Sequence, residues 1–484
     1  MNSIRKTLIY LLHLLISGLL TIILMVIVTH QLTSEELGQF VLVQAYSVIA
    51  VGIANFGMLA GYDRNFFLYE DSKKKSSQLI SSALVPVAFS SLILLVLLFW
   101  LQEHIFQLLL PDQNFSNIIL IVTIGTVAMS MSQYYLTYLK NSGLALQYAK
   151  VSIGNSIMYF FIALFLLFVT SLKSFSLAYA WLLSNALLLF LLFYMHRKLF
   201  KFSFNRDFAS DMLKISLPLT PRVFFGFLHT KFDKIMLGYI GSVDLVGVYH
   251  LGQTLALTIF QFMTGLGRVF QPEIYRKLFA EKHKNSSLEI GNYLLPFFYL
   301  SIFVAILVAL FAKEFVLMFL SEEYRESSLI VVILSIYYAS LFFGKVTGAQ
   351  LIYAKKTNIT TLIMLIGILV NVGLNIPLIL NWGIVGAAWA TTIAGVIMTV
   401  AGYFIAQKYV AISWSWRPIF TIYGFFVLAT FLAMIDYAFI QHFHISLLIK
   451  SFLILLYAFI GYKLNIISVD VIKDVIKGGI ANKV

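Results

Sequence analysis

One apolar stretch carries charged residues in the middle of a length that would cross a bilayer. Between residues 214 and 240 it holds two prolines, a histidine and four charged residues: Pro218, Pro221, Arg222, His229, Lys231, Asp233 and Lys234. A charge at the hydrocarbon centre costs roughly 2.5 to 3.5 kcal/mol on insertion scales, so such a helix is stable only where its charges meet water, a partner or a charged ligand. We therefore expect this span to line a polar cavity inside a helical bundle.

The charge of this span is net positive, because three cations accompany one carboxylate. A cationic cavity suits an anion, and a guanidinium such as that of Arg222 can bind phosphate oxygens bidentately. Lys231 and Lys234 have a second interpretation, since long side chains near the end of a span can extend to interfacial water. Three further basic residues at or near span ends complete the candidate set: Arg64, Arg268 and Lys345.

The composition identifies an integral membrane protein. The chain is 60% hydrophobic and only 11% charged, whereas soluble domains have about 25% charged residues. Its apolar runs are about 20 residues long, the length of a transmembrane helix and twice that of a barrel strand. We predict an all-α membrane protein of about fourteen spans, near residues 8–28, 38–60, 79–101, 116–138, 150–170, 175–195, 213–240, 243–267, 290–312, 327–350, 357–380, 383–407, 417–440 and 445–465.

The basic residues are distributed unevenly between alternate connections. Counted from the N-terminus, one side has 26 of the 34 Lys and Arg, and the other has Lys173, Lys313 and Arg325. The positive-inside rule then places both termini in the cytoplasm. This asymmetry explains the net charge of +13 by topology and anionic headgroups, and it argues against nucleic acid as a partner. The absence of cysteine excludes disulfides and thiolate metal sites.

Similar segments recur about 205 to 209 residues apart. The segment around Gly38 resembles that around Gly247, QYAK ending at Lys150 resembles IYAK ending at Lys355, and AYAWLLSN resembles GAAWATTI. Six spans separate the copies, which is typical of parallel repeats in transporters that work by alternating access. We predict an N-terminal six-helix lobe over 1–205, a C-terminal six-helix lobe over 206–410, and two extra helices with a cytoplasmic tail over 411–484.

At the 209-residue offset, His13 falls opposite Arg222. His13, Ser17 and Thr21 share one helical face. This stripe has two interpretations: it holds neighbouring helices together, or it faces the cavity with His13 near a bound phosphate.

Several motifs, in this order and spacing, resemble the Wzx-type polysaccharide flippases of the multidrug/oligosaccharidyl-lipid/polysaccharide (MOP) exporter superfamily. They are Pro218 through Asp233-Lys234, Val246 to Tyr249, Glu36 to Phe40 and Gly383 to Ala388. The resemblance implies a multi-pass protein of the bacterial inner membrane. Its substrate would be an undecaprenyl-diphosphate-linked oligosaccharide, such as an O-antigen or other surface polysaccharide repeat unit, moved to the outer leaflet.

Two other functions stay open. A cation-coupled multidrug exporter of the same superfamily needs membrane-embedded carboxylates, and the spans contain Asp233 with the more peripheral Asp63 and Asp436. A membrane glycan polymerase or ligase would be expected to have a large external loop or paired carboxylates. We expect no cofactor, with H⁺ or Na⁺ as a coupling ion left open. Expected partners are an anionic lipid-linked oligosaccharide, membrane lipids and a glycan polymerase or ligase.

Overall fold

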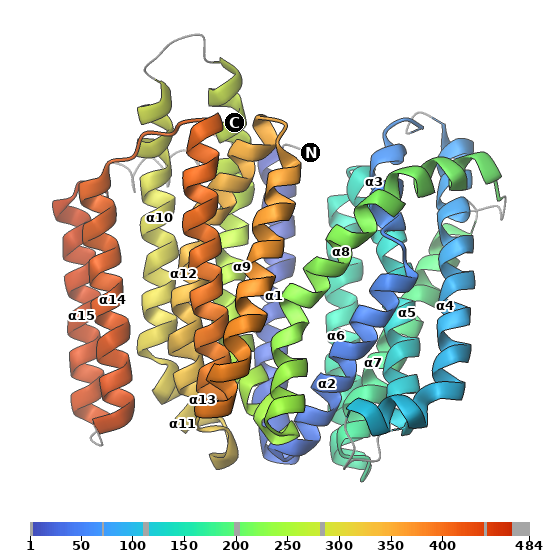
Figure 1. The fold of residues 1–484 in the computed structure, drawn as a ribbon, viewed down its shortest axis with the longest axis horizontal. Helices are drawn as coiled ribbons and strands as arrows, with labels where there is room; N and C mark the ends of the chain where they lie inside the picture. Colours follow the sequence, from blue (N-terminus) through green and yellow to red (C-terminus); the bar gives the residue numbers. More distant parts are fainter. Residues whose placement is uncertain are drawn as a thin grey trace. The chain divides into compact units, whose positions relative to one another are not determined.

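The computed structural model is helical, with no strand in the residues it describes (Figure 1). These residues are 3–69, 72–109, 116–197, 204–280, 286–439 and 443–466, and the side chains of Arg222 and His229 are also outside the description. The helices are α1 (Ser3–Gln31), α2 (Ser34–Ala54), α3 (Met58–Phe66), α4 (Lys73–Leu109), α5 (Ser116–Asn141), α6 (Ala145–Val169), α7 (Ser174–His196), α8 (Arg206–Ile240), α9 (Val243–Ala280), α10 (Ser286–Leu310), α11 (Ala312–Phe319), a 3₁₀ turn η1 (Glu322–Tyr324), α12 (Ser327–Tyr353), α13 (Thr357–Tyr409), α14 (Trp416–Phe439) and α15 (Phe443–Lys463).

The described helices confirm an all-α fold of membrane-spanning length. Twelve of them are long and apolar enough to cross a membrane. One of the twelve, α13, is two helices that meet at Gly383, where the backbone turns at φ 53° and ψ −128°. The 35-residue α8 has too many charges to be recognised by hydropathy, although its length suffices to span a bilayer. Counting α13 twice and adding α8 gives the fourteen spans expected from the sequence.

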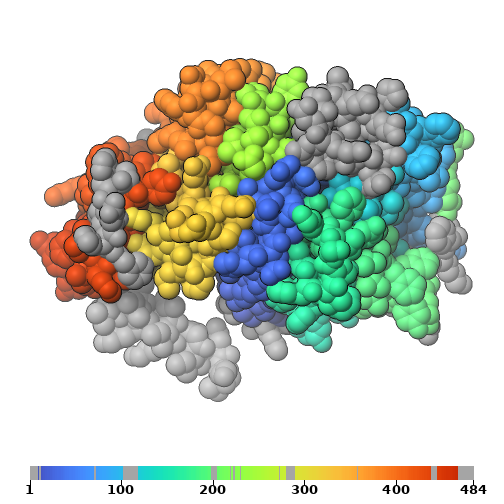
Figure 2. All heavy atoms as spheres, turned by 90° about the horizontal axis from the view of Figure 1, so that it is seen from below, coloured from blue at the N-terminus to red at the C-terminus, as the bar shows by residue number. Residues whose placement is uncertain are grey.

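The helices pack into two compact units. Unit 1 comprises Met1–Leu251 with Val372–Ala387, and unit 2 comprises Gly252–Asn371 with Ala388–Val484. In unit 1, α5 packs on α2, α4 and α7, and α8 packs on α2, α3 and α4. In unit 2, α10 packs on α12, α14 and α15, and the yellow α10–α12 segment lies beside the red C-terminal helices in Figure 2. These units follow contacts rather than the repeat, so the sequence-based division at 205 and 410 stays a prediction.

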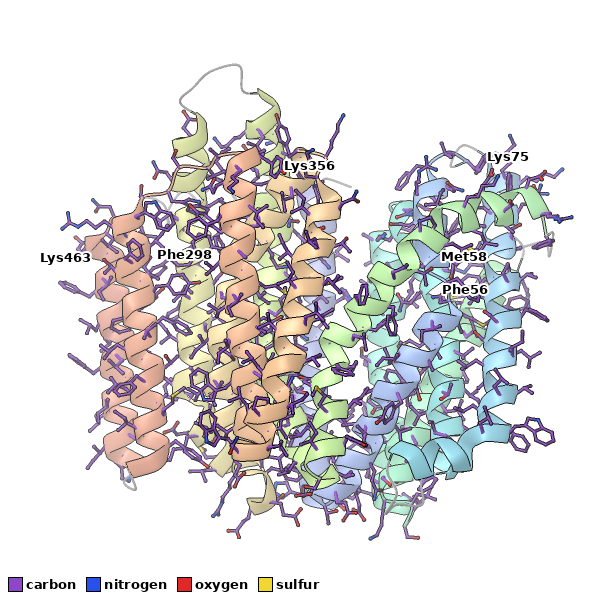
Figure 3. All side chains as sticks on the ribbon, viewed as in Figure 1. Phe56, Met58, Lys75, Phe298, Lys356 and Lys463 are labelled. Atoms are coloured by element: carbon purple, nitrogen blue, oxygen red, sulfur yellow. The ribbon has the colours of Figure 1, made fainter. Side chains whose placement is uncertain are left out.

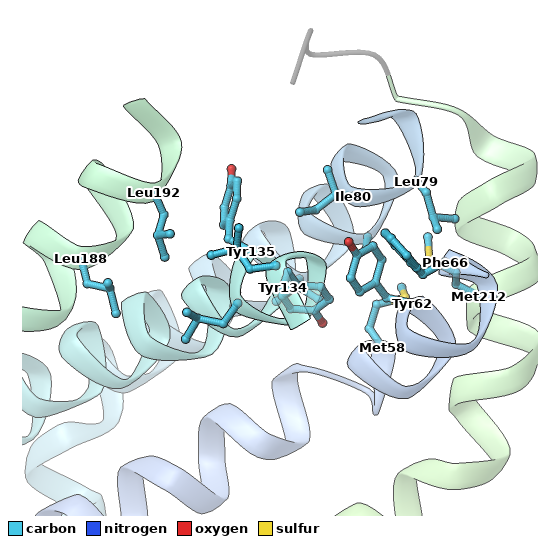
Figure 4. Close-up of a cluster of buried hydrophobic side chains, with 14 residues drawn as sticks. Met58, Tyr62, Phe66, Leu79, Ile80, Tyr134, Tyr135, Leu188, Leu192 and Met212 are labelled. Carbon is cyan, nitrogen blue, oxygen red and sulfur yellow. The ribbon is translucent and has the colours of Figure 1, made fainter. Parts of the chain in front are cut away.

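A helix break shapes the core of unit 1. Between α2 and α3, Phe56 and Gly57 have φ of 47° and 62°, and Figure 3 marks Phe56 and Met58 at this break. The Ser90 hydroxyl donates to the Ala54 carbonyl at 2.6 Å, which satisfies a group that the break leaves open. Beyond the break, Met58 and Tyr62 join the buried cluster of α3, α4, α5, α7 and α8 side chains drawn in Figure 4.

The backbone repeats its geometry about 210 residues apart. α2 begins at Ser34 and α9 at Val243, an offset of 209. Lys173, before α7, has φ 53° and ψ −125°, and Gly383, before the second half of α13, has nearly the same angles. α5 and α12 both end in a Schellman motif. The amide of Leu144 donates to the carbonyl of Leu139, and the amide of Lys356 donates to the carbonyl of Leu351.

The helix ends correct one of the sequence matches. QYAK and IYAK do not occupy equivalent places, because Lys150 lies inside α6 while Lys355 lies between α12 and α13. The ends of α5 and α12, at Asn141 and Tyr353, give an offset of 212 instead of 205. Matches of only four residues give the wrong offset between the two copies, because connections of different length shift the sequence alignment without changing the helices.

Candidate functional site

α8 stays helical in spite of its composition. Asn205 caps its start, with its side-chain oxygen accepting from the amides of Asp207 and Phe208 at 2.8 and 3.2 Å. Two prolines lie within the helix, and the Thr220 hydroxyl donates to the Ser216 carbonyl at 3.1 Å. The structure therefore carries the backbone of the charged span through its full predicted length.

The α8–α9 hairpin in unit 1 buries the acidic member of the candidate set. Asp233 is 4% exposed and accepts a 2.9 Å hydrogen bond from the hydroxyl of Tyr249 on α9. Its other carboxylate oxygen accepts from the amide of Lys234 at 2.8 Å. These hydrogen bonds offset part of the cost of burying the carboxylate.

Basic groups outnumber this carboxylate in the hairpin. Lys234 is only 3% exposed, and Lys231 lies near enough to Asp233 and Lys234 for their charges to interact. His250 on α9 lies close to both lysines, and its Nδ1 is buried without a hydrogen-bond partner among the described residues. Three basic side chains and one acidic one form an environment suited to an anion.

Paired glycines bring the start of α2 against the start of α9, the second helix of this hairpin. A Cβ atom on Gly38 would lie 1.9 Å from the carbonyl oxygen of Val243, and one on Gly247 would lie 2.1 Å from that of Ser34. The contact is reciprocal, because each glycine meets the residue four before the other. Only glycine permits this backbone approach, so the two matched motifs found in the sequence meet each other in the structure.

A second pair of cations lies in unit 2. Lys345 of α12 has its ammonium 4.7 Å from the centre of the Phe260 ring, a cation–π geometry. Arg268 of α9 is near enough for its charge to act on Lys345. Among the described residues Lys345 makes no ion pair with a carboxylate. Lys345 lies about 12 Å and Arg268 about 18 Å inside the nearer end of its helix.

The remaining candidates lie elsewhere in unit 1. His13 is buried and packs edge-on against Tyr148 of α6, with ring centres 5.3 Å apart. Ser17 accepts a hydrogen bond from Ser156 of α6 at 2.8 Å, so this stripe holds helices together. Arg64 is exposed and donates to Asn65 at 3.1 Å. His13 facing a substrate stays a prediction, as does the role of Arg222.

A buried ionic cluster in unit 2 was missed by sequence reasoning. The ammonium of Lys450 on α15 donates to both carboxylate oxygens of Glu314 at 2.6 and 2.7 Å and to Asp436 at 2.7 Å. Ser446 donates to Glu314 at 2.8 Å, and Lys313 donates to the Asp436 carbonyl at 2.6 Å. Glu314, Asp436 and Lys450 are each at most 5% exposed. The only signal in the sequence is a lysine and an aspartate 14 residues apart in the last two spans.

In the described residues, no three His, Cys, Asp or Glu side chains converge as a metal site. The groups that could hold a charged ligand are the two basic clusters described above. Their common feature is an excess of basic side chains inside spans, and the binding of an anion by them stays a prediction.

Comparisons with known proteins agree with this picture. The model of the polysaccharide biosynthesis protein family matches residues 3–276. The capsular polysaccharide biosynthesis protein CapF of Staphylococcus aureus is 24% identical over 420 residues, covering 81% of this chain and 96% of CapF.

Solved structures share the fold. The lipid II flippase MurJ in an inward closed conformation superimposes with a TM-score of 0.72 at 16% identity, covering 96% of this chain and all of MurJ. A mutant of the Vibrio cholerae MATE transporter VcmN has a TM-score of 0.58 at 15% identity, covering 84% of this chain and 95% of VcmN. The resemblance to MOP-superfamily polysaccharide flippases is confirmed, and this multi-pass membrane chain belongs to the polysaccharide biosynthesis protein family.

Proposed function

We propose that the protein is a transporter that flips an undecaprenyl-diphosphate-linked oligosaccharide, a repeat unit of O-antigen or another surface polysaccharide, across the bacterial inner membrane by alternating access. The observation that carries the proposal is the excess of basic side chains in both candidate clusters. Lys231 and Lys234 accompany Asp233 in unit 1, and Arg268 lies near Lys345 in unit 2. A diphosphate cannot cross hydrocarbon unaided, and cations inside spans would replace part of its hydration.

The termini are proposed to lie in the cytoplasm, as the asymmetry of Lys and Arg in the sequence indicates. The lipid-linked substrate would then enter at the side where most basic residues lie. No cofactor is part of the proposal. Coupling to H⁺ or Na⁺ and docking of a glycan polymerase or ligase are further hypotheses that follow from the same assignment.

The multidrug exporter is the rival with the same fold, and the buried carboxylates weigh against it. Binding a cationic drug in a membrane needs an available negative charge. Glu314 and Asp436 are both paired with Lys450, at 2.6 and 2.7 Å, and Asp436 is also paired with Lys313 at 3.7 Å. Asp233 is outnumbered by basic side chains. The described interior therefore offers a better environment for an anion.

Reconstitution into proteoliposomes tests the proposal. A fluorescent short-chain polyprenyl diphosphate carrying a sugar should become accessible to a membrane-impermeant quencher faster with the protein than without it. Lys345→Gln should slow this transfer and Lys345→Arg should retain much of it. Lys463→Gln, at the end of α15, serves as the matched control. Transport of a cationic drug with no transfer of the diphosphate lipid would favour the exporter.

A further inference from the structure

Unit 1 contains an apolar groove between α4, α5 and α7. Its volume is about 550 Å³, within the range of roughly 300 to 1,000 Å³ usual for ligand sites. Ile80 and Tyr135, which belong to the core drawn in Figure 4, contribute to its wall. The α5 and α7 walls consist of Ile124, Val127, Ala128, Met131, Tyr135, Ala186, Leu189, Phe190 and Phe193.

Unit 2 contains a groove of about 440 Å³ between α12, the second half of α13, and α14. It is rich in aromatic side chains, and a Ser340–Thr399 contact of 3.4 Å lies in its wall. The lining residues on α12 and α13 are Ile336, Ser340, Phe343, Val396, Thr399, Val400, Tyr403 and Phe404.

The two grooves occupy equivalent places in the repeat. The ends of α5 and α12 give an offset of 212. With this offset, Ile336, Ser340 and Phe343 of α12 correspond to Ile124, Ala128 and Met131 of α5. Lys173 and Gly383 give an offset of 210. With this offset, the α13 lining residues Val396, Thr399, Val400 and Tyr403 correspond to the α7 lining residues Ala186, Leu189, Phe190 and Phe193. Two independent register marks thus map the α5 and α7 walls onto the α12 and α13 walls, so these two walls belong to the repeated unit. The third wall differs, because it is α4 in unit 1 and α14, outside the predicted repeat, in unit 2.

Both grooves open sideways on residues that face hydrocarbon. Phe190 in unit 1 is 63% exposed, and Phe404 and Phe420 in unit 2 are 63% and 67% exposed. These residues lie in helices of membrane-spanning length, so the grooves face acyl chains rather than water. On α7 and α14 the lining lies in the half of the helix next to a basic end.

Basic residues lie beyond the end of each groove, on the same helix faces as lining residues. On α7, Arg197 comes four residues after Phe193, and on α13, Lys408 comes four residues after Phe404, so each pair shares a face. Arg197 packs over the Tyr194 ring at 3.8 Å. Arg417 at the start of α14 comes three residues before Phe420, which lines groove 2. A ligand with an apolar chain and an anionic end would match this arrangement.

We propose that each groove binds one acyl chain of an anionic phospholipid, whose phosphate lies against Arg197 in unit 1 and against Lys408 and Arg417 in unit 2. Under the orientation proposed above, these lipids come from the cytoplasmic leaflet, whose anionic headgroups attract basic helix ends. A zwitterionic lipid offers the same chain without the net charge. The repeated walls predict two such chain sites, one in each unit, whereas the basic residues beside them are not at equivalent repeat positions.

Native mass spectrometry of the full-length protein tests the proposal. The protein in detergent is mixed with phosphatidylglycerol or with phosphatidylcholine of the same chains. We expect two phosphatidylglycerol molecules to be retained in preference to phosphatidylcholine. Arg197→Gln should remove one of them, and Lys408→Gln with Arg417→Gln the other, each substitution weakening binding roughly fivefold. Lys214→Gln, exposed on α8, is the control for loss of one charge.

Filling the grooves tests the chain site separately. Val400→Trp, on the rim of the unit 2 groove, should release one lipid, whereas Ile397→Trp, exposed on the same helix outside the lining, should not. Ala88→Trp and Leu92→Trp form the matching pair on α4. Elution as a single folded species confirms that each variant is intact. Equal retention of the two lipids, or retention unchanged by Val400→Trp, would overturn the proposal. Displacement of both lipids by polyprenyl phosphate would also overturn it and assign the grooves to the substrate chain.

Discussion

At the scale of single residues, the proposed function rests on the small number of carboxylates that accompany the basic side chains inside the spans. The sequence singled out Asp233 and Lys234, but it could not show that Tyr249 hydrogen-bonds Asp233. That partner lies on the next helix, and the turn between the helices decides which residues meet. Likewise, Glu314 and Lys450 are 136 residues apart, and no local pattern predicts such a contact.

The buried lysine of the α8–α9 hairpin gives the first prediction. Lys234→Gln should reduce flipping of the diphosphate lipid at least tenfold, since it removes positive charge from a net cationic cluster. Asp233→Asn should have a milder effect, because it leaves that charge in place. Both are measured as initial rates in proteoliposomes with equal amounts of protein. A larger loss in Asp233→Asn than in Lys234→Gln would contradict an anion-binding role.

The ionic cluster of unit 2 gives the second prediction, which concerns stability. Lys450→Met leaves the buried carboxylate of Glu314 without its cation and leaves Asp436 with only the more distant Lys313 at 3.7 Å, and breaking such a pair costs about 3 to 5 kcal/mol. Ser446→Ala removes one hydrogen bond to Glu314 and should cost about 1 kcal/mol. Thermal unfolding in one detergent compares the two. A Lys450→Met protein as stable as the parent would exclude a structural role for the cluster.

At the scale of helices, hydropathy predicted most spans because length and apolarity are local properties. The span of α8 was predicted differently, from charged residues within an apolar stretch of spanning length, because its hydropathy alone does not identify it as a span. The register of the repeat was less predictable. The Gly38 and Gly247 motifs matched correctly because backbone contact demands glycine at both, whereas QYAK and IYAK matched by chance.

The reciprocal glycine contact gives the third prediction. Gly38→Ala places a methyl group where the Val243 carbonyl lies, so α2 and α9 must separate at a cost of about 1 to 3 kcal/mol. The thermal unfolding temperature should fall, and flipping with it. Gly154→Ala in α6 is the control, because a Cβ there meets nothing within 4 Å. Equal unfolding temperatures for the two variants would show that the helices do not need this close approach.

At the scale of the whole molecule, the family and fold followed from composition, span number and motif order. The division into compact units did not, because residues 372–387 join unit 1 while the residues on either side of them belong to unit 2. Contacts between distant helices decide that grouping, and they are not encoded in any single span. The orientation in the membrane depends on the charge asymmetry alone and is therefore the whole-molecule property most open to direct test.

The last prediction follows from that asymmetry. The chain has no cysteine, so single cysteines can be introduced and labelled in intact cells with an impermeant maleimide. Glu322→Cys and Ser171→Cys lie on the side with few basic residues and should react, whereas Lys214→Cys and Lys463→Cys should react only after permeabilisation. Lysine-rich connections stay in the cytoplasm because they resist translocation. Glu322, Ser171 and Lys463 are at helix ends or in a connection, and Lys214 is an exposed residue near the start of α8. Labelling of the two lysine positions in intact cells would reverse the orientation, and the proposed entry of substrate from the cytoplasmic leaflet would then be wrong.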